Sequence, residues 1–439
     1  MLIEFSFENY LSFKDKATFS LVVPGKTGSD SERYVLGVEG GRYSVSTFAA
    51  LYGPNASGKS NVIQAVSDFV NLILHSHSLG IDAAIPSYRP YKLDVASQSA
   101  PVAFEAEFVV EGVRYRFSVK FNRKTILEEE LSFFPAGRRA LLYSRGKGEP
   151  ILFGNSFKGP KKGFERYVRD NALFLSTAVN LSNEQLKPVY RYFQQKYGFH
   201  FSMDSSGHWM MSTTNNLLRG DTTAREAYKK AVLSFLNAAD ISVADVSIRK
   251  NDQAVKDITL PADLPQKVRD AVIEGVTSRP SLGHPLYSGD APVGKNEFFD
   301  LYEEESGGTV KMYELAGEII DTLKSGGVLL VDEFNSGLHP QLCEYIISVF
   351  HDRQINKNGA QLIVTDHDTS LMRHDDIYRD ELWLVDRNKY GASELYSIND
   401  FSKDEVRKGT NLERWYLEGR FKAVPSIDPS IFNPEDVHA

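Results

Sequence analysis

The sequence predicts an α/β fold with a mixed central sheet and a β-rich lobe, interrupted by an inserted, mainly helical domain. Three observations predict it. Residues 48–70 read as a buried strand, a glycine-rich loop and a helix. Residues 104–134 alternate between apolar and polar side chains, as paired strands do. Residues 160–280 carry helical periodicity instead, and from about residue 296 helices and strands alternate again.

Residues 53–60 form an intact phosphate-binding motif of the Walker A type, between an apolar strand and an amphipathic helix. The glycines let the backbone approach a phosphate closely, so main-chain N–H groups and the helix N-terminus can hold it. We expect Lys59 to bridge the β- and γ-phosphates of a bound nucleotide and Ser60 to ligate Mg²⁺. The residues expected to bind the nucleotide here are Gly53, Pro54, Asn55, Ala56, Ser57, Gly58, Lys59, Ser60 and Asn61.

The composition is that of an ordinary globular protein, with 42% hydrophobic and 25% charged residues among 439. Cys343 is the single cysteine, which excludes a disulfide within the chain and suits a reducing cytoplasm. No apolar stretch approaches the roughly 18 to 20 residues that span a bilayer. The net charge of −8 argues against nucleic-acid affinity over the whole surface, but leaves a local basic groove open.

Further elements follow from periodicity. Residues 2–21 predict a hairpin, and residues 104–121 predict two strands joined by a turn at Glu111-Gly112, with a third strand at 125–134. Residues 183–199 and 224–240 predict amphipathic helices. The expected domains are an N-terminal lobe (1–155), an inserted mainly helical domain (156–285), a C-terminal lobe (286–427) and a flexible tail (428–439).

A second half of the nucleotide site is predicted at residues 326–334, an apolar strand that ends in Asp332-Glu333. An apolar strand followed by two carboxylates is the Walker B pattern. The carboxylates are well placed to meet a ligand, because parallel sheets bind ligands at the carboxyl ends of their strands. We expect Asp332 to hold Mg²⁺ and Glu333 to polarise the attacking water. Lys59 and Asp332 are far apart in the sequence, so a large insertion separates them. A compact kinase or small GTPase is therefore disfavoured.

Two more motifs distinguish the class of nucleotide-binding protein. Ser306-Gly307-Gly308, here named the signature, precedes a predicted helix and offers a further anion site at its N-terminus. Residues 361–368 form another apolar strand, which leads into His367. A histidine at this place can contact the γ-phosphate and respond to its presence.

Together these motifs resemble the ABC-type ATPase head of chromosome-maintenance and recombination proteins. Within that group the sequence is similar to prokaryotic AAA-family ATPases that include RloA and the abortive-infection protein AbiL, related to the ATPase half of OLD nucleases. The resemblance covers about residues 1–150 and 280–427. It is carried by the segments FSFENYLSF, ESGGT, VLLVDEFNSGLHP, TDHD, ELWLVDRNKYGASELYSINDF and NLERWYLEGRFKAVPSI.

The sequence departs from the pattern of that group at several places. Glu305 stands where a leucine usually precedes the signature serine, and Asp366 precedes the histidine where threonine is frequent. His339 lies where transporters have an aspartate, although OLD-like ATPases commonly have this histidine. The glutamine that senses Mg²⁺ is not placed; Gln98 is a weak candidate against an ordinary loop glutamine.

The resemblance implies a homodimer, or a higher even oligomer, that sandwiches two ATP molecules. Ser306 to Gly308 of one subunit would face Lys59 of the other. It also implies a separately encoded effector, possibly Toprim- or nuclease-like, controlled by this switch in antiphage defence or abortive infection. The alternative is a recombination- or repair-type ATPase that clamps DNA directly. A transporter subunit is disfavoured by the departures and the long insertion.

Two basic stretches are candidates for tracking a nucleic-acid backbone, although a charge run is more often a solvated face. No stretch shows the acidic cluster of a Toprim nuclease, so a partner would make any cut. The basic residues are Lys158, Lys161, Lys162, Arg166 and Arg169 in the first stretch, and Arg138, Arg139, Arg145 and Lys147 in the second.

Overall fold

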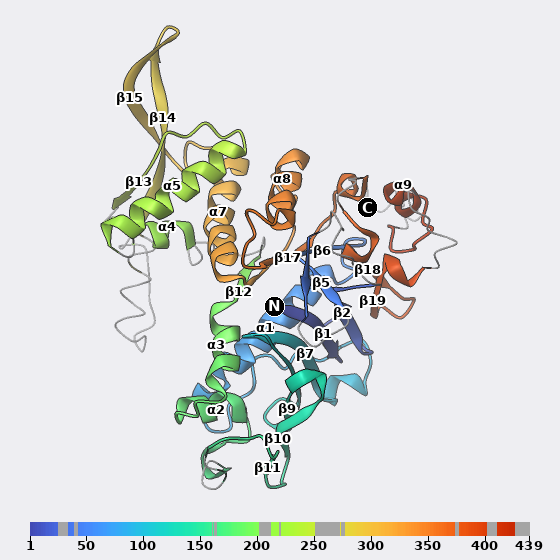
Figure 1. Cartoon of the computed structure of the whole chain (residues 1–439). Coiled ribbons are helices and arrows are strands. Elements are labelled where there is room, and N and C mark those ends of the chain that lie inside the picture. The colour runs from blue at the N-terminus through green and yellow to red at the C-terminus, as the bar shows by residue number, and fades with distance from the viewer. Residues whose placement is uncertain are drawn as a thin grey trace, which may run out of the picture. The chain divides into compact units, whose positions relative to one another are not determined.

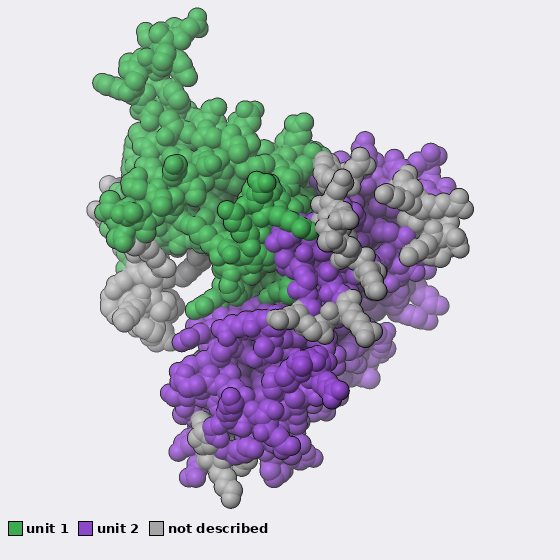
Figure 2. All heavy atoms as spheres, in the orientation of Figure 1, with its two compact units in different colours: residues 1, 195–362 green, residues 2–194, 363–439 purple. Residues whose placement is uncertain are grey.

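The computed structural model describes residues 1–24, 34–38, 43–159, 161, 165–201, 212–218, 221–250, 273, 277–373, 377–401 and 411–425. They fall into two compact units (Figure 2). We name residues 2–194 and 363–439 the P-loop unit, and residues 1 and 195–362 the signature unit. This division differs from the boundaries expected from the sequence, and the inserted helical domain stays a prediction. The expected tail at 428–439 lies outside the described residues.

The P-loop unit contains the phosphate-binding loop and strands from both ends of the chain (Figure 1). Its strands are β1 (Leu2–Glu8), β2 (Ala17–Ser20), β3 (Val22–Val23), β4 (Val35–Gly37), β5 (Ser44–Ser46), β6 (Phe48–Tyr52), β7 (Val102–Val110), β8 (Val113–Phe121), β9 (Ile126–Phe133), β10 (Ala140–Gly146), β11 (Leu152–Phe153), β18 (Leu382–Arg387) and β19 (Ser393–Ser397). Its helices are α1 (Lys59–His75), α2 (Phe174–Asn180), α3 (Lys187–Gln195, whose last residue belongs to the signature unit) and α9 (Leu412–Leu417).

A seven-stranded antiparallel sheet runs in the order β11-β10-β9-β8-β7-β1-β2. The hairpin expected at 2–21 is confirmed as β1 and β2, and β9 confirms the strand expected at 125–134. The turn between β7 and β8 is also confirmed, because Glu111 and Gly112 have φ of 50° and 77° between paired Val110 and Val113. Positive φ at both central residues gives the turn the twist that two-residue hairpins require.

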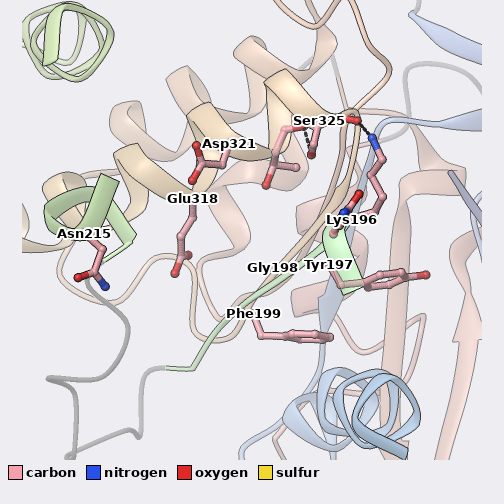
Figure 3. A pocket seen from close by; sticks show the side chains of 10 residues that line it. Lys196, Tyr197, Gly198, Phe199, Asn215, Glu318, Asp321 and Ser325 are labelled. Carbon is pink, nitrogen blue, oxygen red and sulfur yellow. Dashed lines mark hydrogen bonds between the residues drawn. The ribbon is translucent and has the colours of Figure 1, made fainter. Parts of the chain in front are cut away.

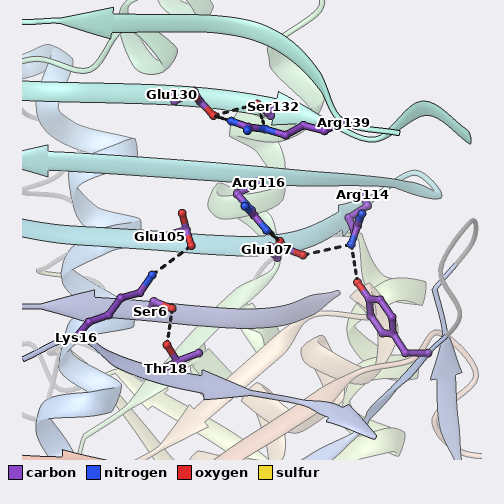
Figure 4. A network of polar contacts seen from close by, with 11 residues as sticks. Ser6, Lys16, Thr18, Glu105, Glu107, Arg114, Arg116, Glu130, Ser132 and Arg139 are labelled. Carbon is purple, nitrogen blue, oxygen red and sulfur yellow. Dashed lines mark hydrogen bonds and ion pairs between the residues drawn. The ribbon is translucent and has the colours of Figure 1, made fainter. Parts of the chain in front are cut away.

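The two faces of this sheet differ in chemistry. One face buries aromatic rings: Phe5 lies 5.4 Å from Phe69 of α1, ring centre to ring centre, and Phe69 lies 5.8 Å from Phe117 of β8. The other face carries polar and charged side chains that pair across strands (Figure 4), such as Lys16 with Glu105 at 3.7 Å. The apolar face fixes how α1 packs, and α1 is the helix that begins in the phosphate-binding loop.

In the same unit, β6, β18 and β19 are strands of a mixed sheet, and β6 leads into the loop. β6 is buried at every residue and pairs in parallel with β18, which pairs antiparallel with β19. The expected strand at 48–52 and the expected helix after the loop are therefore confirmed. The mixed α/β fold class is confirmed as well.

The signature unit combines helices with short parallel and antiparallel strand pairs. Its elements are β12 (Tyr197–His200), α4 (Ser212–Leu218), α5 (Thr222–Ala238), β13 (Asp245–Lys250), β14 (Ser278–Ser288), β15 (Ala291–Asp300), α7 (Gly307–Ser325), β16 (Val328–Val331) and α8 (Pro340–His351). β12 pairs in parallel with β16. β13, β14 and β15 form an antiparallel sheet, and the far end of the β14–β15 hairpin is exposed (Figure 1). β17 (Gln361–Thr365) crosses the boundary between the units.

The helical expectations hold in part. The helix expected at 224–240 is α5, which starts after the N-cap Asp221, whose carboxylate accepts from the N–H of Ala224 at 2.8 Å. The helix expected at 183–199 was too long, because α3 stops at Gln195 and residues 197–200 pair with β16. Strands β13, β14 and β15 were also not expected. Local periodicity does not reveal pairing with a distant strand, so tertiary context decided these segments.

Candidate functional site

The phosphate-binding loop lies in the P-loop unit, between the buried strand β6 and the long helix α1. Gly58 occupies the N-cap position of α1 with φ of 109°, and no side chain caps the helix. The first N–H groups of an α-helix have no partner within the helix, and the helix dipole places partial positive charge there. The start of α1 is therefore suited to bind an anion.

Two glycines of this loop are required by close contacts. A Cβ atom on Gly53 would lie 2.1 Å from the carbonyl oxygen of Val385 on β18. A Cβ atom on Gly58 would lie 2.5 Å from the Oγ of Ser12 and 2.6 Å from the Oγ of Ser393. Both glycines also have positive φ, which other residues rarely adopt. The loop thus keeps its shape only without side chains at these two positions.

Lys59 and Ser57 present polar groups inside the loop. The Nζ of Lys59 donates to the carbonyl oxygens of Gly53 at 2.8 Å and Pro54 at 3.1 Å, and the residue is only 5% exposed. The buried hydroxyl of Ser57 has no hydrogen-bond partner within the described part of the chain. A glycine cradle, a lysine cation and an unsatisfied hydroxyl at a helix start fit a nucleotide phosphate.

Two serines that the sequence did not single out brace this loop. The side-chain amide of Asn61 donates to the Oγ of Ser12 at 2.7 Å, and the Oγ atoms of Ser12 and Ser393 are hydrogen-bonded to each other at 2.7 Å. Ser393 Oγ also donates to the carbonyl oxygen of Ser57. Both serines lie in segments that carry the family resemblance, FSFENYLSF and KYGASELY, and this resemblance was the only sequence signal that could have pointed to them. The hydrogen bond between them could not be predicted, because the two segments are far apart in the sequence.

His367 follows β17 in the P-loop unit. The N–H of Asp366 donates to the carbonyl oxygen of Leu51 at 3.0 Å, so the chain just before His367 lies beside the strand that leads into the loop. The N–H of His367 donates to the Oδ1 of Asp366 at 2.6 Å, and the histidine is exposed. Asp366, noted above as a departure from threonine, thus shapes the backbone at the histidine.

The signature lies at the start of α7 in the signature unit. Ser306 is the N-cap residue, and its Oγ accepts from the N–H of Thr309 at 3.1 Å. Gly307 and Gly308 form the first turn, and Ser306 and Gly307 are exposed. The helix ends at Gly326, which has φ of 63°. The structure therefore places the signature at a helix N-terminus, as the sequence predicted.

The Walker B carboxylates follow β16 in the signature unit. Asp332 is buried, and its N–H donates to the carbonyl oxygen of His200 at 2.8 Å. Glu333 has φ of 49°, which is unusual for a residue other than glycine, asparagine or aspartate. Backbone strain of this kind concentrates at functional sites. The metal-binding role of Asp332 and the catalytic role of Glu333 stay predictions.

Each unit thus holds part of the predicted site. The P-loop unit brings the phosphate-binding loop and His367 to neighbouring strand ends, β6 and β17. The signature unit holds the signature and the two carboxylates after β16.

A cavity of about 460 Å³ lies under the signature helix (Figure 3). Glu318 of α7 projects into the space between α7 and β12, where its Oε2 lies 3.4 Å from the Nδ1 of His200. Burial raises the pKa of the Glu318 carboxyl, and the neighbouring His200 opposes that rise. The Nζ of Lys196 donates to the carbonyl oxygen of Ser325 at the other end of the cavity. These contacts attach α7 to β12.

Two other residues noted in the sequence have structural roles. His339 is the N-cap of α8, where its Nδ1 accepts from the N–H of Gln341 at 3.3 Å. This contact gives a physical reason for histidine at this place. Gln98 lies exposed in the short 3₁₀-helix Ser97–Ser99, where its side-chain amide donates to the carbonyl oxygen of Lys92 at 2.8 Å.

Several residues of the two basic stretches are engaged within the chain. Arg145 donates to the carbonyl oxygens of Ala172 at 2.8 Å and Arg169 at 3.2 Å, and lies 3.6 Å from the buried carboxylate of Glu129. Arg139 pairs with Glu130, and Arg169 donates to the carbonyl oxygen of His77. Lys162 lies outside the described residues. The exposed members that can meet a phosphate backbone therefore include Lys158, Lys161 and Arg166.

Comparison with known proteins shows the family to which the chain belongs. Residues 48–373 match the family model described as "AAA domain, putative AbiEii toxin, Type IV TA system". No curated protein matches the chain. Among solved structures, one SMC head bound to the C-winged helix domain of ScpA has 13% identity and a TM-score of 0.45, over 92% of this chain and 99% of that chain. An SMC head domain from Thermotoga maritima has 13% identity and a TM-score of 0.38, over 90% and 98%.

Within the described residues, no helix is both long enough and apolar enough to cross a bilayer.

Proposed function

We propose that this protein is an ATP-binding and ATP-hydrolysing switch of the ABC type. The chain belongs to the AAA-domain family whose description names a putative AbiEii toxin of a type IV toxin–antitoxin system, and this membership supports the proposal. The observation that carries the proposal is the loop at the start of α1. There Gly53 and Gly58 leave no room for side chains, while Lys59 and the uncapped helix start supply positive charge.

The proposed roles follow from the chemistry of each group. Lys59 and the N–H groups at the start of α1 hold the phosphates of ATP, with the Ser57 hydroxyl as a further donor. Mg²⁺, held by Ser60 and Asp332, would neutralise charge on the phosphate oxygens. Glu333 orients the attacking water and accepts its proton, and His367 contacts the γ-phosphate.

The signature supports a dimer. Ser306 and Gly307 are exposed at the start of α7, and within the described residues a Cβ atom on Gly307 would meet no atom within 4 Å outside its neighbours and its own helix backbone. The packing of the described residues therefore does not require glycine at 307. Close approach of a ligand or a partner backbone does explain it. We propose that the signature of one subunit faces the ATP held by Lys59 of a second subunit, so that two ATP molecules join a homodimer.

The switch then couples ATP to assembly. ATP stabilises the dimer because it contacts both subunits only in the engaged state, and hydrolysis releases them. We propose that the engaged dimer controls a separately encoded effector, Toprim- or nuclease-like, in antiphage defence or abortive infection. The family description and the resemblance to RloA and AbiL support this role. A DNA-clamping maintenance ATPase is the other candidate, because the basic stretch keeps exposed lysines at 158 and 161.

The variant Glu333→Gln tests the proposal. Removing the catalytic carboxylate blocks turnover but not binding, so this protein is expected to form a stable dimer in ATP and Mg²⁺ and to be monomeric in ADP. Light scattering after size exclusion measures both masses. Glu303→Gln is the matched control, because Glu303 is an exposed carboxylate of the same unit. A monomer at saturating ATP in the Glu333→Gln protein overturns the dimer switch.

A second measurement separates the two candidate roles. The Glu333→Gln protein is purified from its host in ATP, and the proteins retained with it are identified. A stoichiometric protein partner supports effector control. Stimulation of wild-type ATP turnover by DNA, without such a partner, favours the DNA-clamping role instead.

A further inference from the structure

Lys311 joins the signature helix to the Walker B turn. Its Nζ donates to the carbonyl oxygen of Glu333 at 2.8 Å and to the carbonyl oxygen of Ser336 at 2.9 Å. Lys311 lies on α7, one turn after the signature glycines, so both partners belong to a different segment of the signature unit. A lysine ammonium has three N–H donors, and two of them are used on this one turn.

The turn that Lys311 contacts includes the proposed catalytic residue. Glu333 has φ of 49°, and the N–H of Ser336 donates to its carbonyl oxygen at 3.0 Å. The Glu333 carbonyl thus accepts from both the turn and the lysine. A non-glycine residue keeps a left-handed backbone only where its surroundings hold it there. The two bonds from Lys311 are part of what holds Glu333 in place.

The signature itself lies against the same turn. A Cβ atom on Gly308 would lie 3.0 Å from the carbonyl oxygen of Gly337, so the first turn of α7 and the turn after Glu333 are in close contact. Further along α7, the Oε2 of Glu318 lies 3.4 Å from the Nδ1 of His200, whose carbonyl oxygen accepts from the N–H of Asp332. Helix α7 therefore contacts the Walker B segment near its N-terminus, at Gly308, and again further along, through Glu318 and His200.

We propose that Lys311 is a positioning residue that couples the signature to Glu333 within each chain. The inference rests on the proposed function, in which the signature faces the partner's ATP while Glu333 acts on the ATP of its own chain. Lys311 then links the two ATP sites of the dimer. Engagement of the signature at one site fixes the backbone of the catalytic residue at the other.

The main test replaces Lys311 by methionine, which keeps the aliphatic stem and removes the donors. We expect kcat for ATP hydrolysis to fall about tenfold or more, because a displaced catalytic group loses its alignment with the reacting atoms. The Kd for ATP is expected to stay within about twofold, and the ATP-bound dimer to form as in wild type. Lys324→Met is the matched control, since Lys324 is an exposed lysine at the far end of the same helix.

A second readout does not depend on catalysis. Hydrogen–deuterium exchange of the N–H groups of Ser336 and Leu338 is expected to be about tenfold faster in Lys311→Met without nucleotide. Protection in β13 and β14 of the same unit is expected to be unchanged, which shows that the signature unit has folded. Lys311→Arg is expected to restore protection of the turn, because a guanidinium also donates to two carbonyl oxygens.

The outcomes separate the inference from the function on which it rests. Unchanged exchange at Ser336 and Leu338 in Lys311→Met overturns the inference, and so does a kcat equal to that of wild type. Faster exchange that Lys311→Arg does not restore also counts against it. If wild-type protein neither dimerises in ATP nor hydrolyses it, the proposed function fails, whereas the exchange measurement still decides whether Lys311 holds the turn.

Discussion

The Nε2 of His284 lies 2.7 Å from the Oε1 of Glu305, the residue that directly precedes the signature serine. The Nδ1 of the same ring lies 3.0 Å from the carbonyl oxygen of Ser242. Each ring nitrogen therefore contacts a different segment of the signature unit. The pair attaches the β14–β15 hairpin to the start of α7. It gives a physical reason for glutamate where related ATPases have leucine.

Replacing Glu305 by leucine is expected to release the base of this hairpin. The part-buried charged hydrogen bond is lost, at a cost of about 1 to 2 kcal/mol in local stability. Hydrogen–deuterium exchange of residues 281–288 and 297–300 measures the effect. Glu303→Leu is the control, because Glu303 is exposed near the same turn. Equal exchange in the two variants contradicts a coupling role for the pair.

Gly307→Ala is expected to separate folding from dimer formation. The added methyl group meets no neighbouring element in the described part of the chain, so the free energy of unfolding is expected to stay within about 1 kcal/mol of wild type. ATP-dependent dimerisation is expected to be lost, because the signature approaches its partner through this glycine. Chemical denaturation and light scattering measure the two properties.

The contrast is Gly317→Ala on the same helix, where a Cβ atom would lie 2.4 Å from the Oγ1 of Thr213. That variant is expected to be less stable by about 1 to 3 kcal/mol from overpacking. A Gly307→Ala protein that still dimerises in ATP would rule out the proposed contact at the signature.

Lys59→Ala is expected to weaken ATP binding by about 100-fold, because a charge-assisted contact to phosphate is lost. The variant also loses the bonds that its Nζ donates to Gly53 and Pro54. Titration calorimetry with ATP measures the Kd. Lys187→Ala serves as the control, since Lys187 pairs with the exposed Glu184 on the surface of the same unit. Unaltered ATP binding in Lys59→Ala would show that the loop is not the nucleotide site.

Glu129→Ala is expected to destabilise the P-loop unit by about 3 to 5 kcal/mol, because it leaves Arg145 without its buried carboxylate. The carboxylate also accepts from the N–H groups of Phe174 and Leu175, at 2.7 and 2.9 Å, and so caps α2. Burial raises the pKa of Glu129, and the Arg145 charge opposes that rise.

The control for this buried site is Glu130→Ala, one residue along the same strand. Glu130 pairs with Arg139 on the polar face of the sheet (Figure 4), where about 1 kcal/mol or less is expected. Urea denaturation compares both variants with wild type. Similar losses in the two would mean that burial does not set the value of the Glu129 contacts.

Much of the candidate site could be predicted from sequence because its parts are local. The phosphate-binding loop needs Gly53 and Gly58 at fixed spacing between a strand and a helix, and both elements carry their own periodicity. The same holds for the hairpin turn at Glu111-Gly112. Ser12 and Ser393 could not be predicted in this way, because their bonds to the loop join segments far apart in the chain.

The sequence by itself determined the local chemistry: a phosphate-binding loop, a strand ending in Asp332-Glu333, and a serine and two glycines at a helix start. Tertiary structure alone decided which distant groups act on them. Residues 197–200 form a strand because they pair with β16, and the periodicity of the sequence does not show this pairing. Tertiary structure also placed Lys311 on the backbone of Glu333 and His284 beside Glu305. Such contacts depend on packing between elements, which no short segment encodes.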